Sequence, residues 1–338
     1  MISALSNFRC WTERRPRTSG QNPGEPAESV QLSGLPATGW KVWRAVTLAT
    51  ALALATACSP SPPALASQNT VKVLTLNVWH DSKEGVDQVA ELIRTSGADI
   101  VGLQESSKNS PVLAEKLKFN HFQQGETTAI LSRFPIERAT PGKHGVVVEL
   151  PSGKRLGVGN LHLNHQPYQP YQLLRIPYGD HPFIQTEAQA QEQAELARGQ
   201  EIRGALQDLT ALEGLPRVLT GDFNEPSHLD WTERAARAGL HPLKVDWPTS
   251  RAAEQAGWQD SFRVLNPDEV ARPGWTWTPM TRPDDPADHH DRLDFVLYQG
   301  IKPLKVDIVA ERPENGTIVV QPYPTDHRGV LTTFQLEP

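Results

Sequence analysis

Short runs of apolar and β-branched residues recur along the chain from residue 71 onward, and polar clusters separate them. Each run is four to eight residues long, and several alternate apolar with polar positions, which is typical of β-strands. The predicted strands are residues 71–78, 100–103, 128–131, 145–150, 156–163, 217–220, 293–298, 305–309 and 329–334. The pattern therefore predicts a body rich in β-structure.

Two longer stretches, residues 85–96 and 186–212, have the apolar spacing of helices. In the second stretch the apolar positions recur at intervals of roughly three and four residues: Ala190, Ala194, Ala197, Ile202, Leu206 and Leu209. Strands follow one another with helices only irregularly between them. This order favours stacked sheets covered by helices over a strict alternation of strands and helices.

Three polar stretches are predicted to be loops: residues 164–180, 241–257 and 272–291. Long ordered loops on a sheet scaffold are where substrate selection usually resides. The third carries a dense run of acidic residues and histidines: Asp284, Asp285, Asp288, His289, His290 and Asp291. Such a run is more typical of a solvated loop than of a second cation site.

The first 66 residues differ from the rest. Residues 1–40 are rich in Pro, Gly, Ser and Arg and form an extension, or reflect a misassigned start. Residues 41–66 are typical of an export signal: Lys41 and Arg44 precede an uncharged run of 14 residues, whereas about 20 are needed to span a membrane. Cleavage before Cys58 would give a lipoprotein and cleavage after Ala66 a freely secreted protein, with lipidation favoured. Residues 67–70 are a tether to the domain at 71–338.

Composition narrows the function classes. Both cysteines, Cys10 and Cys58, lie in the leader, so the body has neither a disulfide nor thiol chemistry. Without residues 1–66 the chain keeps 27 basic and 36 acidic residues, a net charge of −9. That charge disfavours tight nonspecific binding of DNA.

Polar residues stand at the ends of several predicted strands. Asp222 and Asn224 are two positions apart, which aims both side chains to one face of a strand. Asp294 interrupts an apolar run, and a buried carboxylate needs a partner, for which Asp326-His327 is a candidate. Taken singly, each has a plainer interpretation as a turn, a solvated strand end or, for His162, a core histidine. Together they are acids, amides and imidazoles, which suit a hard cation and a phosphate.

The ordered motifs resemble those of the endonuclease/exonuclease/phosphatase superfamily over roughly residues 71–335. They are Asn77 in Leu-Asn-Val-Trp, Gln104-Glu105, Leu131-Ser132-Arg133-Phe134-Pro135-Ile136, His162 in Leu-His-Leu, Gly221-Asp222-Phe223-Asn224, Arg292-Leu293-Asp294-Phe295 and Asp326-His327. The resemblance implies an α+β fold, a four-layer α/β sandwich of two packed, mainly antiparallel sheets flanked by helices. It also implies a hydrolase that acts on phosphoester bonds.

The resemblance also implies roles for individual residues. Glu105 would bind Mg²⁺ or Mn²⁺, with Asn77 and Asp326 in or beside its coordination shell. Asp222 and Asn224 would orient or deprotonate the attacking water and contact the phosphate.

The two histidines would act on the phosphate. Asp294 would pair with His327, which would stabilise the transition state or serve as the base. His162 would hold a phosphate oxygen or protonate the leaving group. The body has no cysteine and no pair of histidines four residues apart, so a zinc site is not expected.

The substrate stays open, because the superfamily includes enzymes that act on nucleic acids, inositol phosphates, sphingomyelin-like headgroups and nucleotides. The acidic body favours a small molecule or a lipid headgroup over nucleic acid. Arg175 with Tyr171 and Tyr178 is a candidate grip for one phosphate and a ring, or alternatively a packing loop. The alternatives are an extracellular nuclease and a noncatalytic surface-binding module.

The export signal sets the expected location. The protein is expected in the bacterial cell envelope as a lipoprotein, on the outer surface of a membrane, or secreted or periplasmic. No protein partner is inferred.

Overall fold

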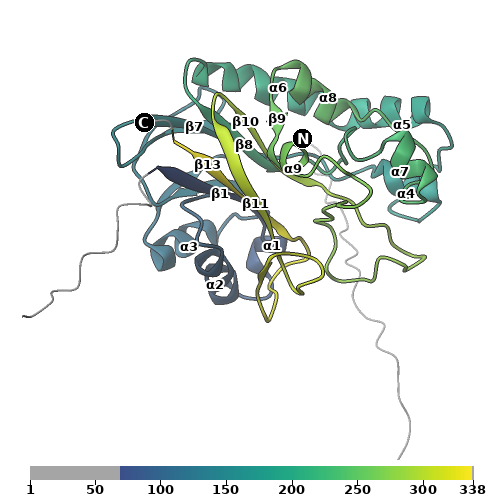
Figure 1. The fold of residues 1–338 in the computed structure, drawn as a ribbon, viewed down its shortest axis with the longest axis horizontal. Helices are drawn as coiled ribbons and strands as arrows, with labels where there is room; N and C mark the ends of the chain where they lie inside the picture. Colours follow the sequence, from purple (N-terminus) through teal and green to yellow (C-terminus); the bar gives the residue numbers. More distant parts are fainter. Residues whose placement is uncertain (1–68, 337–338) are drawn as a thin grey trace, which may run out of the picture. The chain divides into compact units, whose positions relative to one another are not determined.

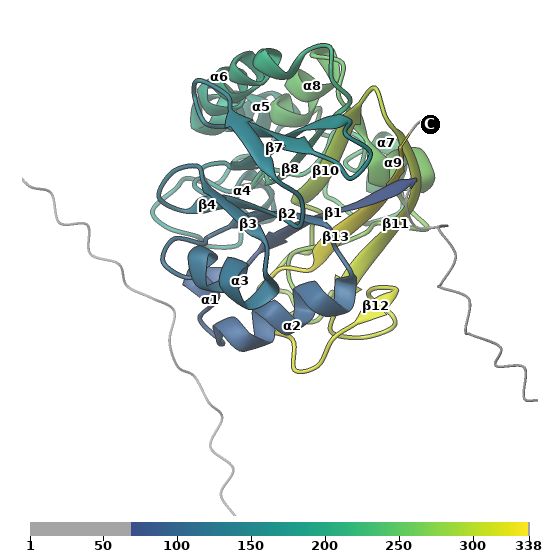
Figure 2. The ribbon, with the colours of Figure 1, turned by 90° about the vertical axis from the view of Figure 1, so that its left-hand side faces the viewer.

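The computed structural model describes residues 69–336, which form two stacked β-sheets (Figures 1 and 2). The seven-stranded sheet has the order β12-β11-β13-β1-β2-β4-β3, and the six-stranded sheet has the order β5-β6-β7-β8-β10-β9. Only the pairs β1–β2, β7–β8 and β11–β12 are parallel. The expectation of two mainly antiparallel sheets is confirmed.

The strands of the seven-stranded sheet are β1 (Thr70–Asn77), β2 (Ile100–Gln104), β3 (Asn120–Gln123), β4 (Thr128–Ser132), β11 (Lys302–Ala310), β12 (Ile318–Val319) and β13 (Gly329–Gln335). Those of the six-stranded sheet are β5 (Ile136–Ala139), β6 (Gly145–Glu149), β7 (Arg155–His162), β8 (Arg217–Asp222), β9 (Gln259–Asp260) and β10 (Asp294–Gln299). All nine predicted strands are present. The short strands β3, β5, β9 and β12 were not predicted.

Helices cover the outer face of each sheet, which completes four layers (Figure 2). On the seven-stranded side lie α1 (Trp79–Ser82), α2 (Val86–Ser96) and α3 (Ser110–Leu117). The remaining helices are α4 (Gln169–Leu174), α5 (Glu187–Ala194), α6 (Gln200–Leu209), α7 (Glu233–Arg237), α8 (Pro248–Gln255) and α9 (Ser261–Leu265). Of these, α6 and α8 pack on the six-stranded sheet, as do α2 and α3 on the other.

Strict alternation along the central strands divides the apolar residues between two cores. In β1, Val71 and Val73 point into the space between the sheets, whereas Leu74 and Leu76 pack under α2. In β8, Val218 points inward and Leu219 packs toward α6. Because successive strand residues face opposite sides, the inward set continues to Thr75 and Asn77 in one sheet and to Thr220 and Asp222 in the other.

A layer of buried polar side chains follows the apolar residues between the sheets. Gln104 Nε2 donates to Asn160 Oδ1 at 2.6 Å, and the Thr220 hydroxyl donates to the same oxygen at 3.0 Å. Gly102 faces this layer, and a Cβ atom there would lie 1.9 Å from the Thr220 hydroxyl oxygen. The sheets therefore approach so closely that only glycine fits at position 102. This polar layer separates the apolar core from the strand ends.

Three predictions about helices and loops need correction. The predicted helix at 186–212 is continuous, but a π-helical turn at Glu195–Gly199 and a 3-10 turn at Thr210–Leu212 interrupt its α-helical geometry. The predicted loops at 164–180 and 241–257 contain α4 and α8, respectively, so both predictions were wrong in part. Both helices carry proline in their first turn, where its missing N–H costs no hydrogen bond.

The predictions for residues 1–40, for the signal at 41–66, for Cys58 and for most of the tether lie outside the described residues. Within residues 69–336, no helix combines the length and the apolar character needed to cross a bilayer.

Candidate active site

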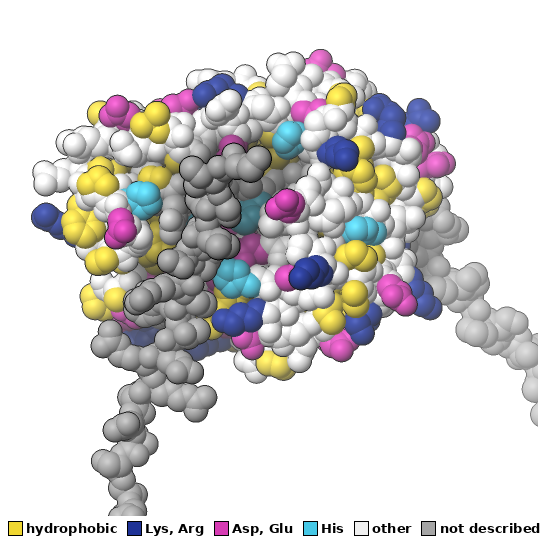
Figure 3. Space-filling model, turned by 180° about the vertical axis from the view of Figure 1, so that it is seen from behind, with side chains coloured by type: hydrophobic (Ala, Val, Ile, Leu, Met, Phe, Trp, Pro, Cys, Tyr) yellow, Lys and Arg dark blue, Asp and Glu magenta, His cyan; other side chains and the backbone are white. Residues whose placement is uncertain are grey.

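Five strands and one loop bring their polar residues to the same edge of the two sheets. The carboxyl ends of β1, β2, β7 and β8 lie there, and β10 begins there because it runs antiparallel to β8. In the six-stranded sheet, His162, Asp222 and Asp294 stand directly opposite one another on adjacent strands. Figure 3 shows histidine and acidic side chains gathered near the middle of one face of the molecule.

The centre of the site is a line of three side chains, in which Asp294 is hydrogen-bonded to His327 and His327 lies within ion-pair distance of Asp222. His327 Nδ1 lies 2.9 Å from Asp294 Oδ2, and its Nε2 lies 3.8 Å from Asp222 Oδ2. All three side chains are buried. Burial alone would lower the pKa of His327, but the charges of Asp294 and Asp222 outweigh it and hold that pKa well above its usual value. His327 is therefore a buried cation between two carboxylates.

Asn77 joins the two sheets at this point. Its Nδ2 donates to Glu105 Oε1 at 3.2 Å and to Asp222 Oδ2 at 3.0 Å. Its Oδ1 accepts the backbone N–H of Trp79 at 3.0 Å, which fixes the orientation of the amide. In this arrangement the Asn77 amide nitrogen aligns two carboxylates. Its Oδ1, the atom that could ligate a metal, already accepts one hydrogen bond from the Trp79 backbone.

Glu105 is held by an unusual backbone turn. Residues Trp79–Ser82, which form α1, all have positive φ values, and so does Glu105 itself at 53°. Left-handed conformations are strained for residues with side chains and concentrate at functional sites. Asp81 stabilises the turn by accepting the backbone N–H groups of Ser107 and Asn109.

The turn aims the His80 backbone N–H at Glu105 Oε2, 2.7 Å away. Burial would raise the pKa of Glu105, but this hydrogen bond and the charge of His327 outweigh it and lower that pKa. Glu105 is therefore kept as a carboxylate.

Asp326 has one carboxyl oxygen without a hydrogen-bond partner in the described part of the chain. Its Oδ1 is buried and makes no hydrogen bond within the described residues. Burial is the main cause that raises its pKa to about 6, with repulsion from Glu105 and Asp222 adding to it and the charge of His327 opposing it. An orphaned oxygen in an acidic surrounding is the environment that a cation would stabilise.

Asn224 lies beside Asp222 in a left-handed conformation, with φ at 48°, which asparagine tolerates better than most residues. Its backbone N–H donates to Asp222 Oδ1 at 2.8 Å, and its side-chain Nδ2 donates to the Leu163 carbonyl at 2.8 Å. His162 completes this side of the site, with Nε2 3.8 Å from Asp222 Oδ2. Asp222 Oδ2 thus lies between two imidazoles.

A buried ion pair fixes the loops behind Asn224. Glu225 follows it, and Glu225 Oε2 lies 3.1 Å from the Nε of Arg198, which projects from the π-helical turn. The Arg198 guanidinium also donates to the Asn164 and Pro167 carbonyls. The loop after β7 is therefore tied to the loop after β8.

One group of possible metal ligands at this site comprises Asp222, Asp294 and His327, whose ligand atoms all lie within 4.8 Å of one another. It differs from the predicted set of Asn77, Glu105 and Asp326. Because both nitrogens of a protonated imidazole carry hydrogens, His327 in its charged form cannot be a ligand. A ligand has to be deprotonated, so His327 would have to lose a proton to join such a group, whereas Glu105 and Asp326 offer carboxylate oxygens.

The three residues predicted to bind substrate have different surroundings and do not form one group. Tyr178 is partly exposed, and burial together with the charges of Glu105, Asp326 and Asp222 raises its pKa, so it borders the acidic cluster. The Tyr171 hydroxyl is committed to Asp288. Arg175 lies exposed over the ring of Phe183 and makes no recorded contact with the acids.

Sequence reasoning missed several residues around His327. The Thr276 hydroxyl accepts the backbone N–H groups of Leu293 and Asp294, at 2.9 and 3.2 Å, and so fixes the start of β10. Trp277 pairs with His327 through the backbone and places its ring 6.4 Å from the imidazole. Both lie in the predicted loop at 272–291, and their only sequence signal was an aromatic, proline-rich composition.

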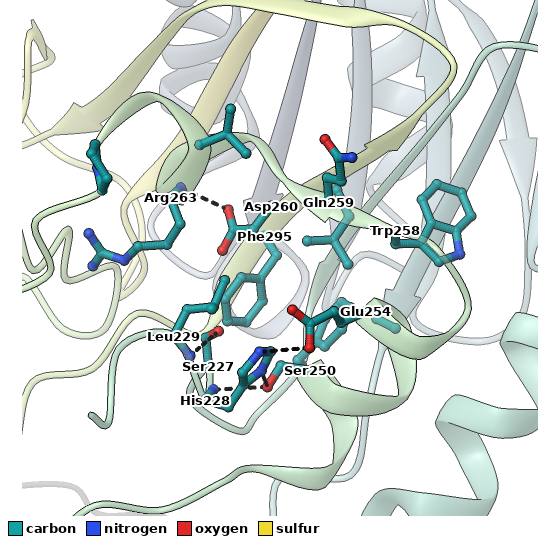
Figure 4. Close-up of a pocket in the computed structure, with 15 residues that line it drawn as sticks. Ser227, His228, Leu229, Ser250, Glu254, Trp258, Gln259, Asp260, Arg263 and Phe295 are labelled. Carbon is teal, nitrogen blue, oxygen red and sulfur yellow. Dashed lines mark hydrogen bonds and ion pairs between the residues drawn. The ribbon is translucent and has the colours of Figure 1, made fainter. Parts of the chain in front are cut away.

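A pocket lies elsewhere in the fold. It measures about 340 Å³ and lies between α8, α9 and β10, with His228, Ser250 and Glu254 along one wall (Figure 4). His228 Nδ1 lies 2.8 Å from the Ser250 hydroxyl, and its Nε2 lies 3.3 Å from Glu254 Oε2. None of the predicted catalytic residues lines this cavity, so it is separate from the strand-end site.

Comparisons with known proteins identify similar chains. A Caenorhabditis elegans protein described as uncharacterised is 27% identical, with 79% of this chain and 92% of that protein covered. The crystal structure of an endonuclease/exonuclease/phosphatase from Beutenbergia cavernae has a TM-score of 0.51 at 17% identity, covering 79% of this chain and 72% of that one. An AP endonuclease from Archaeoglobus fulgidus has a TM-score of 0.49 at 13% identity, covering 78% and 98%.

The Beutenbergia cavernae structure supports the fold, whereas the assignment to a family rests on a family model. The model described as the endonuclease/exonuclease/phosphatase family matches residues 74–327, which include every strand-end residue described above. The chain therefore belongs to the endonuclease/exonuclease/phosphatase family.

Proposed function

We propose that this protein is an exported phosphoesterase that hydrolyses phosphodiester or phosphomonoester bonds by attack of water and depends on Mg²⁺ or Mn²⁺. The single observation that carries the proposal is the buried line Asp294–His327–Asp222 beside Asp326, whose Oδ1 has no hydrogen-bond partner among the described residues. A buried imidazolium next to several acids is suited to stabilising a phosphoryl group in its transition state.

The charges fit a divalent cation. Four carboxylates, those of Glu105, Asp222, Asp294 and Asp326, interact with one imidazolium, so the cluster carries an excess of negative charge. Glu105 and Asp326 would hold the cation through oxygen atoms, which suits Mg²⁺ or Mn²⁺. A bound cation would neutralise phosphate charge and make water a better nucleophile.

Alignment of the acids, proton transfer and stabilisation of charge are assigned to side chains of the site. Asn77 keeps Glu105 and Asp222 aligned across the two sheets. Asp294 accepts a hydrogen bond from His327 Nδ1 and thereby directs Nε2 toward Asp222. Asp222 Oδ2 is placed to orient or accept a proton from the attacking water, while His162 and His327 stabilise charge on the phosphoryl oxygens or protonate the leaving group.

The substrate is proposed to be a small phosphoester or a lipid headgroup in preference to nucleic acid. The body has a net charge of −9, and the acidic cluster would repel a long polyanion. Tyr178 beside the acids offers a ring against which one substrate group can pack. Export, as a lipoprotein through Cys58 or as a secreted or periplasmic protein, rests on the signal pattern at 41–66.

The test is hydrolysis of bis-p-nitrophenyl phosphate and p-nitrophenyl phosphate with Mg²⁺, with Mn²⁺ or with EDTA. We expect turnover with either metal and none with EDTA, and we expect Glu105→Gln to require much more metal than the wild type. Glu115→Gln, an exposed acid on α3, is the matched control and should behave as the wild type. Absence of metal-dependent turnover in folded protein would overturn the proposal and favour a noncatalytic binding module.

The substrate class needs a separate panel of DNA, RNA, sphingomyelin, inositol phosphates and nucleotides. A small-molecule or lipid enzyme should leave plasmid DNA intact at low salt. Efficient cutting of that DNA would instead support an extracellular nuclease. Mass spectrometry of the mature N-terminus would decide whether Cys58 carries lipid.

A further inference from the structure

A second cluster of metal-binding side chains lies outside the strand-end site. His241 comes from the segment between α7 and α8, and His289 and Asp291 come from the loop that leads into β10. His241 Nδ1 lies 3.3 Å from His289 Nε2 and 4.0 Å from Asp291 Oδ1, and His289 Nε2 lies 3.8 Å from Asp291 Oδ2. Asp291 and His241 are buried and His289 is largely so. The prediction that the acidic and histidine-rich run from Asp284 to Asp291 is a solvated loop was therefore wrong for its last residues, His289, His290 and Asp291.

The Asp291 carboxylate is held in place by neutral donors only. The indole N–H of Trp231 donates to Oδ1 at 2.8 Å, and the Tyr168 hydroxyl donates to Oδ2 at 2.6 Å. Among the described residues, its recorded ion-pair partners are His241 and His289, and no lysine or arginine reaches it. The Asp291 side chain is 1% exposed. A buried carboxylate without a cation is costly, so this position calls for a positive charge.

The spacing of the three groups suits a small transition-metal ion. Zinc bonds of about 2.0–2.2 Å at tetrahedral angles place neighbouring ligand atoms roughly 3.3–3.6 Å apart. The imidazole pair already has this separation. The two oxygens of Asp291 each face one imidazole, at 4.0 and 3.8 Å, and one ligand atom from each residue can be chosen so that all three lie within 4.8 Å of one another. The ring of Trp231 stacks on His241 with centroids 4.3 Å apart, which fixes the orientation of that imidazole.

We propose that His241, His289 and Asp291 bind a zinc ion at a site distinct from the catalytic cluster. Two imidazole nitrogens and one carboxylate match zinc, whereas Mg²⁺ prefers oxygen ligands throughout. The Trp231 and Tyr168 hydrogen bonds serve as the outer support that ligating carboxylates usually have. Three protein ligands leave the fourth position to water.

The zinc site would stabilise a segment that lies next to the strand-end site. The Asp291 backbone pairs with Trp277, and Trp277 pairs in turn with His327. A zinc ion would fasten this segment to the segment carrying His241, across 50 residues of sequence. The proposal stands independently of the hydrolytic activity, since it rests on ligands that the catalytic cluster does not use.

The experiment measures zinc in the purified protein after dialysis against metal-free buffer, by inductively coupled plasma mass spectrometry. We expect about one bound zinc ion per chain in the wild type, as three protein ligands imply. Glu105→Gln should keep that ion, whereas His289→Ala and Asp291→Asn should each lose it. His290→Gln is the matched control, because His290 precedes Asp291 but bonds to Thr281.

Cobalt binding provides a second measurement that does not depend on the folding of any variant. Co²⁺ added to the zinc-free wild type should give the visible absorption of a tetrahedral site, and an equivalent of zinc should abolish it. Zinc content that is equal in the wild type, His289→Ala and Asp291→Asn would overturn the proposal. So would a wild type that binds neither zinc nor tetrahedral Co²⁺, in which case a direct His241–His289 hydrogen bond accounts for the cluster.

Discussion

Two buried histidines in this protein have similar partners and opposite electrostatics. His327 lies between Asp294 and Asp222 at the strand ends, and His228 lies between Ser250 and Glu254 on the wall of the cavity in Figure 4. Two buried acids raise the pKa of His327. By contrast, burial and the charge of Arg251 lower the pKa of His228 although Glu254 opposes them. Glu254 is half exposed, so its charge is screened by solvent.

The Ser250 hydroxyl also differs from an activated nucleophile. It accepts the backbone N–H of His228 at 2.9 Å and lies 3.2 Å from the Trp247 carbonyl, so it completes the turn at the start of α8. Ser250, His228 and Glu254 are therefore not arranged as a catalytic triad, although they are linked in that order in space. The comparison shows that the candidate site is the region of buried charge, whereas the pocket in Figure 4 holds a histidine without such a charge.

The strongest test of this comparison breaks the structural link between the two regions. Asp230 is buried and accepts hydrogen bonds from Arg292, two residues before Asp294, and from Arg263, which lines the cavity. Asp230→Ala leaves two buried guanidinium groups with one fewer acid, so we expect it to lower the free energy of unfolding by about 3–5 kcal/mol. Urea denaturation followed by circular dichroism measures this change.

The matched control for that experiment is Glu233→Ala, which removes an exposed ion pair with Arg237. Its effect on the free energy of unfolding should stay below about 1 kcal/mol. A similarly small effect of Asp230→Ala would show that the two regions are not linked through this carboxylate.

The next test compares the two histidines directly. His327→Ala removes the buried cation and should lower kcat for bis-p-nitrophenyl phosphate at least about a hundredfold with the fold retained. His228→Ala should leave kcat unchanged, because His228 contacts no residue of the strand-end site. Near-normal turnover in His327→Ala, or a large loss in His228→Ala with intact circular dichroism, would reverse the assignment of the two regions.

The smallest expected effect concerns pH and stability. Because burial lowers the pKa of His228 below the ordinary value of 6.5, the unfolded chain binds more protons than the folded protein once the pH falls below that value. The contribution of His228 to stability should therefore decrease as the pH falls below 6.5, by less than about 1.4 kcal/mol per pH unit. Urea denaturation of the wild type and His228→Gln between pH 8 and 5 measures the difference, on the order of this bound. A difference that is constant with pH would contradict the prediction.

The fold and the residues of the strand-end site follow from the same property of the sequence. Alternation along β1 and β8 places Asn77 and Asp222 on the inward face, so the strands and the side chains between the sheets could be predicted together. The motif order named the same residues. Their metal, water and phosphate roles stay predictions, since the orientation of Asn77 depends on the Trp79 N–H and on a left-handed turn that no periodicity reveals.

Other features depend on residues far apart in the sequence. The polar stretches at 164–180 and 241–257 were predicted to be loops, whereas they contain α4 and α8, each with proline in its first turn. The short strands β3 and β5 contain few apolar residues. Each lies at the edge of its sheet and pairs with one strand, β3 with β4 and β5 with β6. The burial of Asp291 depends on Tyr168 and Trp231, which lie 123 and 60 residues away.

The amide of Asn77 has a mechanical consequence. It spans the seam between the sheets, with Glu105 on one side and Asp222 on the other, so the alignment of the candidate site depends on how the two sheets pack along this plane. A change in side-chain volume anywhere along that plane, as at Gly102, would reach the catalytic atoms as a shift in alignment without touching them. In engineered variants of this scaffold we therefore expect loop substitutions to alter recognition and substitutions along the seam to alter turnover.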